Sequence, residues 1–214
     1  MIDHAVLKPE LTDVDVVAAL EMAKRHGIAC VTVRPCDIDL AARILAGSAV
    51  KPGSVSSFPH GWQNTATKLY ETRDLLRRGA KEIDMAVAIS KLLSREFQHV
   101  QTELIQMSEA CHKEGALLKV ILETGYLTDE LKIIACRCCE RAEVDFVQAS
   151  TDIAPADDLA LLRKYLPEEI GLKSSALTVE EALAAHAAGC SRIGTTATAA
   201  ILEAWKARIA PPTV

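Results

Sequence analysis

The sequence predicts a (β/α)8 barrel, in which eight parallel strands alternate with helices. Short apolar runs alternate with longer helical patterns, and successive runs start roughly 22 to 35 residues apart, which is the length of a βα unit. Runs such as "IACVTV" and "LLKVILE" are almost continuously apolar, as is typical of parallel strands covered on both faces. The expected strands lie near residues 2–7, 28–34, 51–58, 82–88, 117–123, 144–150, 169–175 and 191–196.

The intervening segments carry helix start and stop signals. Thr12 precedes one helical pattern with Asp15 in capping-box spacing, and Gly27 follows it. Thr178 and Glu181 repeat the capping box before another helix. An open doubly wound sheet is the alternative fold, but no G-x-G-x-x-G motif follows the first expected strand. The barrel is therefore the favoured prediction.

Composition limits the possible partners and locations. The chain has 214 residues, of which half are hydrophobic and a quarter charged, and its formal net charge is −5. We expect one domain over residues 1–214, no nucleic-acid partner because no basic face is evident, and no membrane span. The seven cysteines include Cys136, Cys138 and Cys139 in a C-x-C-C run that does not match common zinc spacings. We expect structural thiols, no metal and a cytoplasmic protein.

Polar residues inside the apolar strands identify candidate catalytic groups. They are Asp3, Asp84, Lys119, Gln148 and Lys173. A buried charge is costly unless it is paired, so we expect Lys119, Lys173 and Asp84 to balance one another inside the barrel. Crowding two lysines should lower the pKa of at least one, and such an amine attacks carbonyl carbons. The alternative is an ion-pair network that only supports the barrel.

Small and hydroxyl-bearing residues follow the last strands. Barrel enzymes often bind phosphate after strands seven and eight, through backbone N–H groups and hydroxyls. Ordinary capping of the strand ends is the alternative interpretation. The candidates for binding substrate or phosphate are Ser150, Ser174, Ser175, Gly194, Thr195 and Thr196, with Asp3 beside them.

Several motifs in order resemble the deoxyribose-phosphate aldolase family: "IDHAVLKPELT", "VSSFPHGWQNTATKLYE", "GAKEIDMAV", "LLKVILETGYLTDE", "VDFVQAST", "GLKSSALTVEEAL" and "GCSRIGTT". The resemblance runs from Ile2 to about Leu202. It implies a barrel-shaped class I aldolase, often dimeric, that uses neither metal nor cofactor. Such an enzyme cleaves 2-deoxyribose 5-phosphate to acetaldehyde and glyceraldehyde 3-phosphate through a lysine Schiff base. A small aldehyde or sugar phosphate is thus the expected partner, and a homodimer is possible.

Residue by residue, the resemblance assigns roles. Asp84 falls on the proton-relay aspartate, Lys173 on the second catalytic lysine and Lys119 on the lysine of the fifth strand. Asp3 matches a first-strand aspartate near the site. The family pattern in the sixth strand is F-V-K-T-S-T-G, whereas this chain reads F-V-Q-A-S-T-D, so Gln148 replaces the Schiff-base lysine. An amide is not a nucleophile and can only hydrogen-bond.

Nearby departures accompany Gln148. Asp152 replaces a glycine, Ala176 replaces a glycine of the phosphate loop, and Ala5 and Thr32 replace a threonine and a cysteine. An engineered or natural knockout of an ordinary aldolase is one hypothesis, but Ala149, Asp152 and Ala176 argue against a single engineered substitution and indicate a diverged pocket.

Three further hypotheses follow from the substitution. The Schiff base has moved to Lys173 or Lys119. Alternatively, Asp84 and Lys173 act as acid and base without a Schiff base, while Gln148 polarises the carbonyl group. In the third hypothesis the protein is a non-catalytic relative that binds a sugar phosphate or a partner protein.

Overall fold

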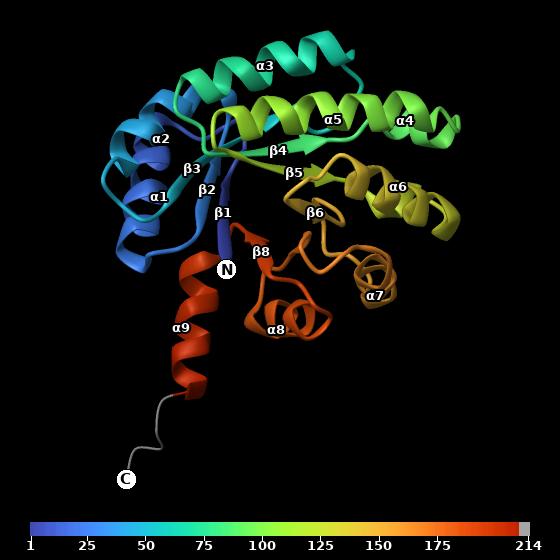
Figure 1. The fold of residues 1–214 in the computed structure, drawn as a ribbon. Coiled ribbons are helices and arrows are strands. Elements are labelled where there is room, and N and C mark those ends of the chain that lie inside the picture. The colour runs from blue at the N-terminus through green and yellow to red at the C-terminus, as the bar shows by residue number, and fades with distance from the viewer. Residues whose placement is uncertain (210–214) are drawn as a thin grey trace.

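The computed structural model describes residues 1–209 and contains a closed barrel of eight parallel strands, each hydrogen-bonded to the next. β1 pairs with β8, which closes the ring near the N-terminus (Figure 1). The predicted fold class is therefore confirmed. The strands are β1 (Ile2–Val6), β2 (Cys30–Val33), β3 (Lys51–Ser56), β4 (Glu82–Ala86), β5 (Leu117–Ile121), β6 (Phe146–Gln148), β7 (Gly171–Ser175) and β8 (Arg192–Thr195).

Helices surround the strands and cover their outer faces (Figure 1). None of the helices in residues 1–209 is long and apolar enough to cross a membrane. They are α1 (Asp13–His26), α2 (Ile38–Leu45), α3 (Thr65–Arg77), α4 (Ile89–Leu93), α5 (Phe97–Lys113), α6 (Asp129–Arg141), α7 (Ala156–Tyr165), α8 (Val179–Ala187) and α9 (Thr198–Ile209), with short 3-10 turns η1 (Pro35–Asp37) and η2 (Thr124–Tyr126).

The predicted helix caps form as expected. Thr12 and Asp15 complete a capping box at the start of α1, and Gly27 ends that helix with φ of 59°. Thr178 and Glu181 complete a second box at the start of α8. Each box satisfies backbone N–H groups that a helix terminus leaves without an intrahelical partner.

Alternation along each strand separates the core from the site. Outward-facing side chains such as Ile83, Leu118 and Leu172 are fully buried beneath the helices. The residues directly next to them along each strand point into the barrel, because successive side chains of a strand lie on opposite faces. Asp84 and Lys119, which flank these positions, therefore share the barrel interior.

The end of one strand and the cysteine run show how local packing refines the expectations. β6 ends at Gln148 instead of residue 150, because the carbonyl oxygen of Ser150 leaves the ladder and accepts a hydrogen bond from Gln148 Nε2 (2.9 Å). The structural thiols expected at Cys136, Cys138 and Cys139 are all buried, although Cys138 lies on a different face of the helix from the other two. The reason is that α6 packs against both α5 and α7, so it buries a wide face.

Candidate active site

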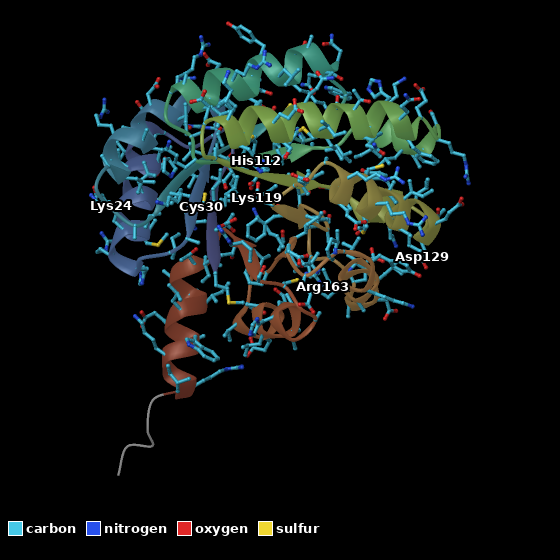
Figure 2. All side chains as sticks on the ribbon, in the orientation of Figure 1. Lys24, Cys30, His112, Lys119, Asp129 and Arg163 are labelled. Carbon is cyan, nitrogen blue, oxygen red and sulfur yellow. The ribbon has the colours of Figure 1, made fainter. Side chains whose placement is uncertain are left out.

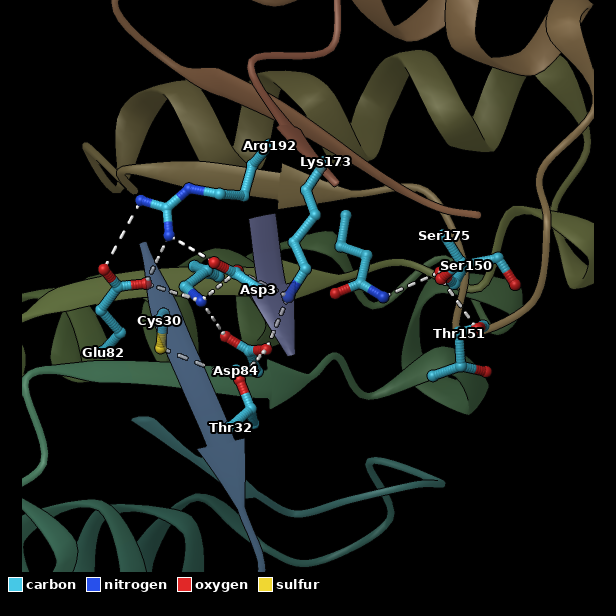
Figure 3. Close-up of polar contacts among 12 residues, drawn as sticks. Asp3, Cys30, Thr32, Glu82, Asp84, Ser150, Thr151, Lys173, Ser175 and Arg192 are labelled. Atoms are coloured by element: carbon cyan, nitrogen blue, oxygen red, sulfur yellow. Dashed lines mark hydrogen bonds and ion pairs between the residues drawn. The ribbon is translucent and has the colours of Figure 1, made fainter. Parts of the chain in front are cut away.

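Six charged side chains meet inside the barrel and form what we call the ion cluster. It contains three carboxylates and three cations, so its formal charge is zero, and each member is at most 9 % exposed. Figure 3 shows the carboxylates in contact with the cations. The members are Asp3, Glu82, Asp84, Lys119, Lys173 and Arg192.

Sheet register explains how these residues come together. Asp84 on β4 is the partner of Lys119 on β5, and Lys173 on β7 is the partner of both Gln148 on β6 and Arg192 on β8. Partners in parallel strands point to the same face, so all of these side chains enter the interior. The predicted charge balance between the two lysines and Asp84 is confirmed.

Lys119 lies at the centre of the ion cluster and is fully buried. Figure 2 labels its place among the barrel strands. Its Nζ is 2.8 Å from Asp3, 2.7 Å from Glu82 and 2.9 Å from Asp84. Burial alone would lower the pKa of Lys119, but Asp84, Asp3 and Glu82 together hold it well above its ordinary value. Crowding with a second lysine therefore does not lower the pKa of Lys119, because the nearby carboxylates outweigh that lysine. Lys119 stays an ammonium and is not a nucleophile.

Lys173 forms the upper part of the ion cluster. Its Nζ donates to Asp84 at 2.7 Å and lies 3.1 Å from Asp3. Asp84 also accepts a hydrogen bond from the Thr32 hydroxyl at 3.3 Å. Threonine at this position, where the family pattern has cysteine, therefore adds a donor to the carboxylate that faces Lys173.

The two aspartates are held as carboxylates. Burial by itself raises the pKa of Asp3 and of Asp84, but the neighbouring cations outweigh burial and lower both values. Lys119 and Lys173 are the main causes, and Arg192 adds to them at Asp3. Both groups are therefore ionised at neutral pH and can accept protons.

A cavity of about 550 Å³ opens above the ion cluster at the carboxyl ends of the strands. This is where barrel enzymes hold their substrates. Lys173, Asp84 and Asp3 form the charged part of its floor, and Lys173 is the one lysine among its lining residues in the described chain. Lys119 lies beneath the floor and does not line the cavity. A larger hollow, about 830 Å³, lies outside the barrel between α3 and α5, away from these groups.

Gln148 lines the cavity and is 6 % exposed. Its Nε2 donates to the carbonyl oxygen of Ser150, which can only accept, so the amide orientation is fixed. The buried Oε1 atom has no hydrogen-bond partner within residues 1–209. It therefore presents an acceptor for a ligand hydroxyl or amine.

The remaining predicted residues divide into two groups. Ser175, Gly194, Thr195 and Thr196 line the cavity, whereas Ser150 and Ser174 lie outside its lining. The Ser150 hydroxyl donates to Glu123 at 2.7 Å, and the Ser175 hydroxyl donates to the Thr151 carbonyl at 2.9 Å. Ser174 is buried beside the cavity. Several of the expected phosphate donors are thus already used within the chain.

One group of side chains has the spacing of a metal site. Oxygen and sulfur atoms of Asp3, Cys30 and Glu82 lie within 4.8 Å of one another. Arg192 and Lys119 already neutralise these two carboxylates, and burial raises the pKa of the Cys30 thiol well above its ordinary value. A protonated thiol and paired carboxylates do not fit a cation.

Sequence reasoning overlooked Glu82 and Arg192 as members of the ion cluster. Glu82 precedes Asp84 by two residues and therefore shares its face of β4. Arg192 is a charge within the eighth apolar strand, and its guanidinium is 2.5 Å from Asp3 and 3.0 Å from Glu82. Both residues stand at the start of an expected strand, so a search for charges that included the first residues of every strand would have found them.

Solved structures with this barrel define the class of protein first. The chain superposes on "QR15, an Aldolase" with a TM-score of 0.89 at 29 % identity, covering 96 % of this chain and 94 % of that one. It superposes equally well, with a TM-score of 0.89 at 27 % identity, on the tetrameric deoxyribose phosphate aldolase from Aeropyrum pernix, covering 97 % and 90 % of the two chains. The class is that of the barrel aldolases, which are carbon–carbon lyases.

Sequence comparison then gives the family. The DeoC/LacD family aldolase model matches residues 1–157. The deoxyribose-phosphate aldolase of Caldanaerobacter subterraneus is 40 % identical over 213 residues, which cover 96 % of this chain and 92 % of the relative. That of Treponema denticola is 38 % identical over 207 residues, covering 94 % and 96 %. The chain belongs to the DeoC/LacD aldolase family, as its motifs predicted.

Proposed function

We propose that the protein cleaves and forms carbon–carbon bonds in small β-hydroxyaldehydes of the 2-deoxyribose type, with Lys173 as the Schiff-base amine. The observation that carries this proposal is the position of Lys173: within residues 1–209 it is the one lysine lining the cavity, and Asp84 lies 2.7 Å from its Nζ. The family relatives supply the reaction class. Gln148 excludes an amine at the usual position, and burial with three ion pairs excludes Lys119.

The proposed chemistry follows from these contacts. Lys173 passes a proton to Asp84, and its free amine attacks the aldehyde carbon to form a carbinolamine. Asp84 returns the proton to the carbinolamine hydroxyl, which leaves as water and gives an iminium ion that the Asp84 carboxylate stabilises by charge. Asp84 then accepts the proton of the β-hydroxyl, the carbon–carbon bond breaks with its electron pair moving to the iminium, and the first aldehyde leaves. Asp84 gives this proton to the enamine carbon, and water hydrolyses the new iminium, which releases the second aldehyde and regenerates the amine.

Gln148 has a binding role in this scheme. Its fixed Oε1 atom accepts a hydrogen bond from a substrate hydroxyl, because that atom has no partner within the described chain. Such a contact positions the β-hydroxyl without taking part in covalent chemistry. The phosphate-binding roles of Ser175, Thr195 and Thr196 and a homodimeric assembly are expectations from the resemblance, to be tested by phosphate affinity and by analytical ultracentrifugation.

A second candidate function is favoured by the ion pairs of Lys173. Two carboxylates hold its ammonium at 2.7 and 3.1 Å, which stabilises the charged form. In this alternative, the Lys173 ammonium polarises the carbonyl group and Asp84 acts as the base, so the aldol cleavage proceeds without a covalent bond.

Borohydride trapping distinguishes the two functions. The protein is incubated with acetaldehyde, reduced and mapped by mass spectrometry, in parallel with the variants Lys173→Met and Lys81→Met. Lys81 is an exposed lysine before β4 and serves as the matched control. We expect an adduct on Lys173 in the unmodified protein and in Lys81→Met. Turnover of a β-hydroxyaldehyde without an adduct supports the non-covalent reaction, whereas absence of both refutes catalysis by this site.

A further inference from the structure

The outer part of the cavity differs in chemistry from its floor. We call its exposed lining residues the rim, and among them are two large apolar side chains, Ile153 at 46 % and Leu177 at 57 % exposure. The rim contains one carboxylate, Asp152, and no cation, and the others are hydroxyl residues. The rim residues are Thr151, Asp152, Ile153, Leu177 and Thr196.

Charge at the rim is unfavourable for an anion. The ion cluster below is neutral, so it offers no net positive charge to a phosphate group. Asp152 forms no ion pair with any residue in 1–209, so its negative charge is unbalanced. A second carboxylate, Glu123, lies behind the rim, where it accepts from the Thr151 backbone N–H at 2.9 Å.

Three backbone donors near the rim are also engaged. The N–H group of Asp152 donates to the Ser150 hydroxyl at 3.2 Å, and that of Ala176 donates to the Gly194 carbonyl at 3.0 Å. The N–H group of Leu177 donates to the Glu181 carboxylate at 2.8 Å. Phosphate sites in barrels depend on such N–H groups, which here would have to exchange an existing partner for the anion.

We propose that the ligand of this cavity is an unphosphorylated hydroxyaldehyde or hydroxyketone whose far end is uncharged and apolar. The carbonyl end lies at Lys173, a hydroxyl contacts Gln148 Oε1, and a short alkyl end packs between Ile153 and Leu177. Covering these two exposed side chains removes apolar surface from water, which favours binding of an alkyl end over a charged one. The reaction rests on the proposed function, whereas the preference for an uncharged ligand is a property of binding.

Three matched compounds test the proposal: 2-deoxyribose 5-phosphate, 2-deoxyribose and 2,5-dideoxyribose, which differ only in the group on carbon five. We expect kcat/KM to rise in that order, with the dideoxy compound at least about tenfold above the phosphate ester. We also expect no competition by millimolar inorganic phosphate. A higher kcat/KM for the phosphate ester, or competitive inhibition by submillimolar phosphate, would overturn the proposal.

Two charge variants test whether Asp152 causes the preference for an uncharged ligand. Asp152→Asn removes the unbalanced charge, and Glu169→Gln makes the same change at an exposed position before β7, at the opposite end of the barrel. One charge about 7 Å from a phosphate dianion in a water-like dielectric weakens binding roughly sevenfold. Asp152→Asn should lower the ratio of kcat/KM for 2,5-dideoxyribose to kcat/KM for 2-deoxyribose 5-phosphate by about that factor. Glu169→Gln should leave this ratio unchanged. Equal effects of the two variants would contradict the assignment to Asp152.

Binding separates this proposal from the proposed function. If no compound is cleaved, isothermal titration of the unmodified protein with the same three compounds still measures their order of affinity. Tighter binding of 2,5-dideoxyribose than of the phosphate ester supports the uncharged ligand even then. Tighter binding of the phosphate ester refutes it whether or not turnover occurs.

Discussion

Replacing Lys119 with methionine should strongly destabilise the fold. The substitution keeps a similar side-chain volume but leaves three buried carboxylates facing two cations. Lys119 is fully buried and lies 2.7 to 2.9 Å from each of these three carboxylates. Removing one partner of a buried ion pair costs about 3–5 kcal/mol, because a charge remains without compensation in a poorly solvated place. We expect the free energy of unfolding to fall by about that amount.

Urea denaturation followed by circular dichroism measures this loss. Lys91→Met is the matched control, because Lys91 forms an ion pair of similar length with Glu96 (2.8 Å), but both side chains are largely exposed, at 39 % and 50 %. Exposed pairs contribute about 0 to 1 kcal/mol, so this variant should be almost as stable as the unmodified protein. A loss below about 1 kcal/mol in Lys119→Met, or equal losses in the two variants, would refute the reasoning.

The same variant should change the pH dependence of stability. In the unmodified protein the folded-state pKa values of Asp3 and Asp84 are lowered, so their stabilisation is present above the unfolded pKa of about 3.9 and is lost as pH falls below it. Without Lys119, one carboxylate lacks compensation and its folded-state pKa should rise above about 3.9. The difference in stability between the variant and the unmodified protein should therefore be smaller at pH 4.5 than at pH 7.5. A difference independent of pH would mean that packing, not charge, causes the loss.

Three further predictions concern the site and its support. Lys173→Met should lower kcat/KM for any aldol substrate by at least about a hundredfold while circular dichroism stays unchanged, and full activity would exclude Lys173 from the reaction. Gln148→Lys should place a second amine in the cavity, and borohydride reduction with acetaldehyde should trap an adduct on this amine. Gln98→Lys on exposed α5 should give no increase in cleavage. An inert lysine at position 148 would mean that the pocket has diverged at more positions than that of the nucleophile. Gly61→Ala should lower the free energy of unfolding by about 2–5 kcal/mol, because φ is 68° and the new Cβ would lie 1.8 Å from the Val87 carbonyl oxygen. Gly125→Ala, where a Cβ meets nothing within 4 Å, should change stability by less than about 0.5 kcal/mol in the same thermal or urea denaturation, and equal effects would contradict the steric explanation.

The site residues were predictable from sequence to different degrees. Asp84, Lys119 and Lys173 stand out because they are charges within apolar strands, and the structure brings all three into contact. Gln148 was predictable as a departure from the family motif. Its orientation was not, because the carbonyl oxygen of Ser150 sets it, and that depends on where β6 ends.

Sequence alone determined the barrel, because side-chain periodicity and helix caps are local properties that the chain expresses before any long-range contact forms. It also determined which side chains face inward, since alternation along a strand needs no knowledge of the neighbouring strands. Only the tertiary structure decided the chemical state of those side chains. The pKa of Lys119 depends on the sum of its burial and three carboxylates from two other strands, β1 and β4. Coulomb interactions depend on distance in space, and residues such as Asp3 and Lys119, which are 116 positions apart along the chain, meet only when the barrel closes.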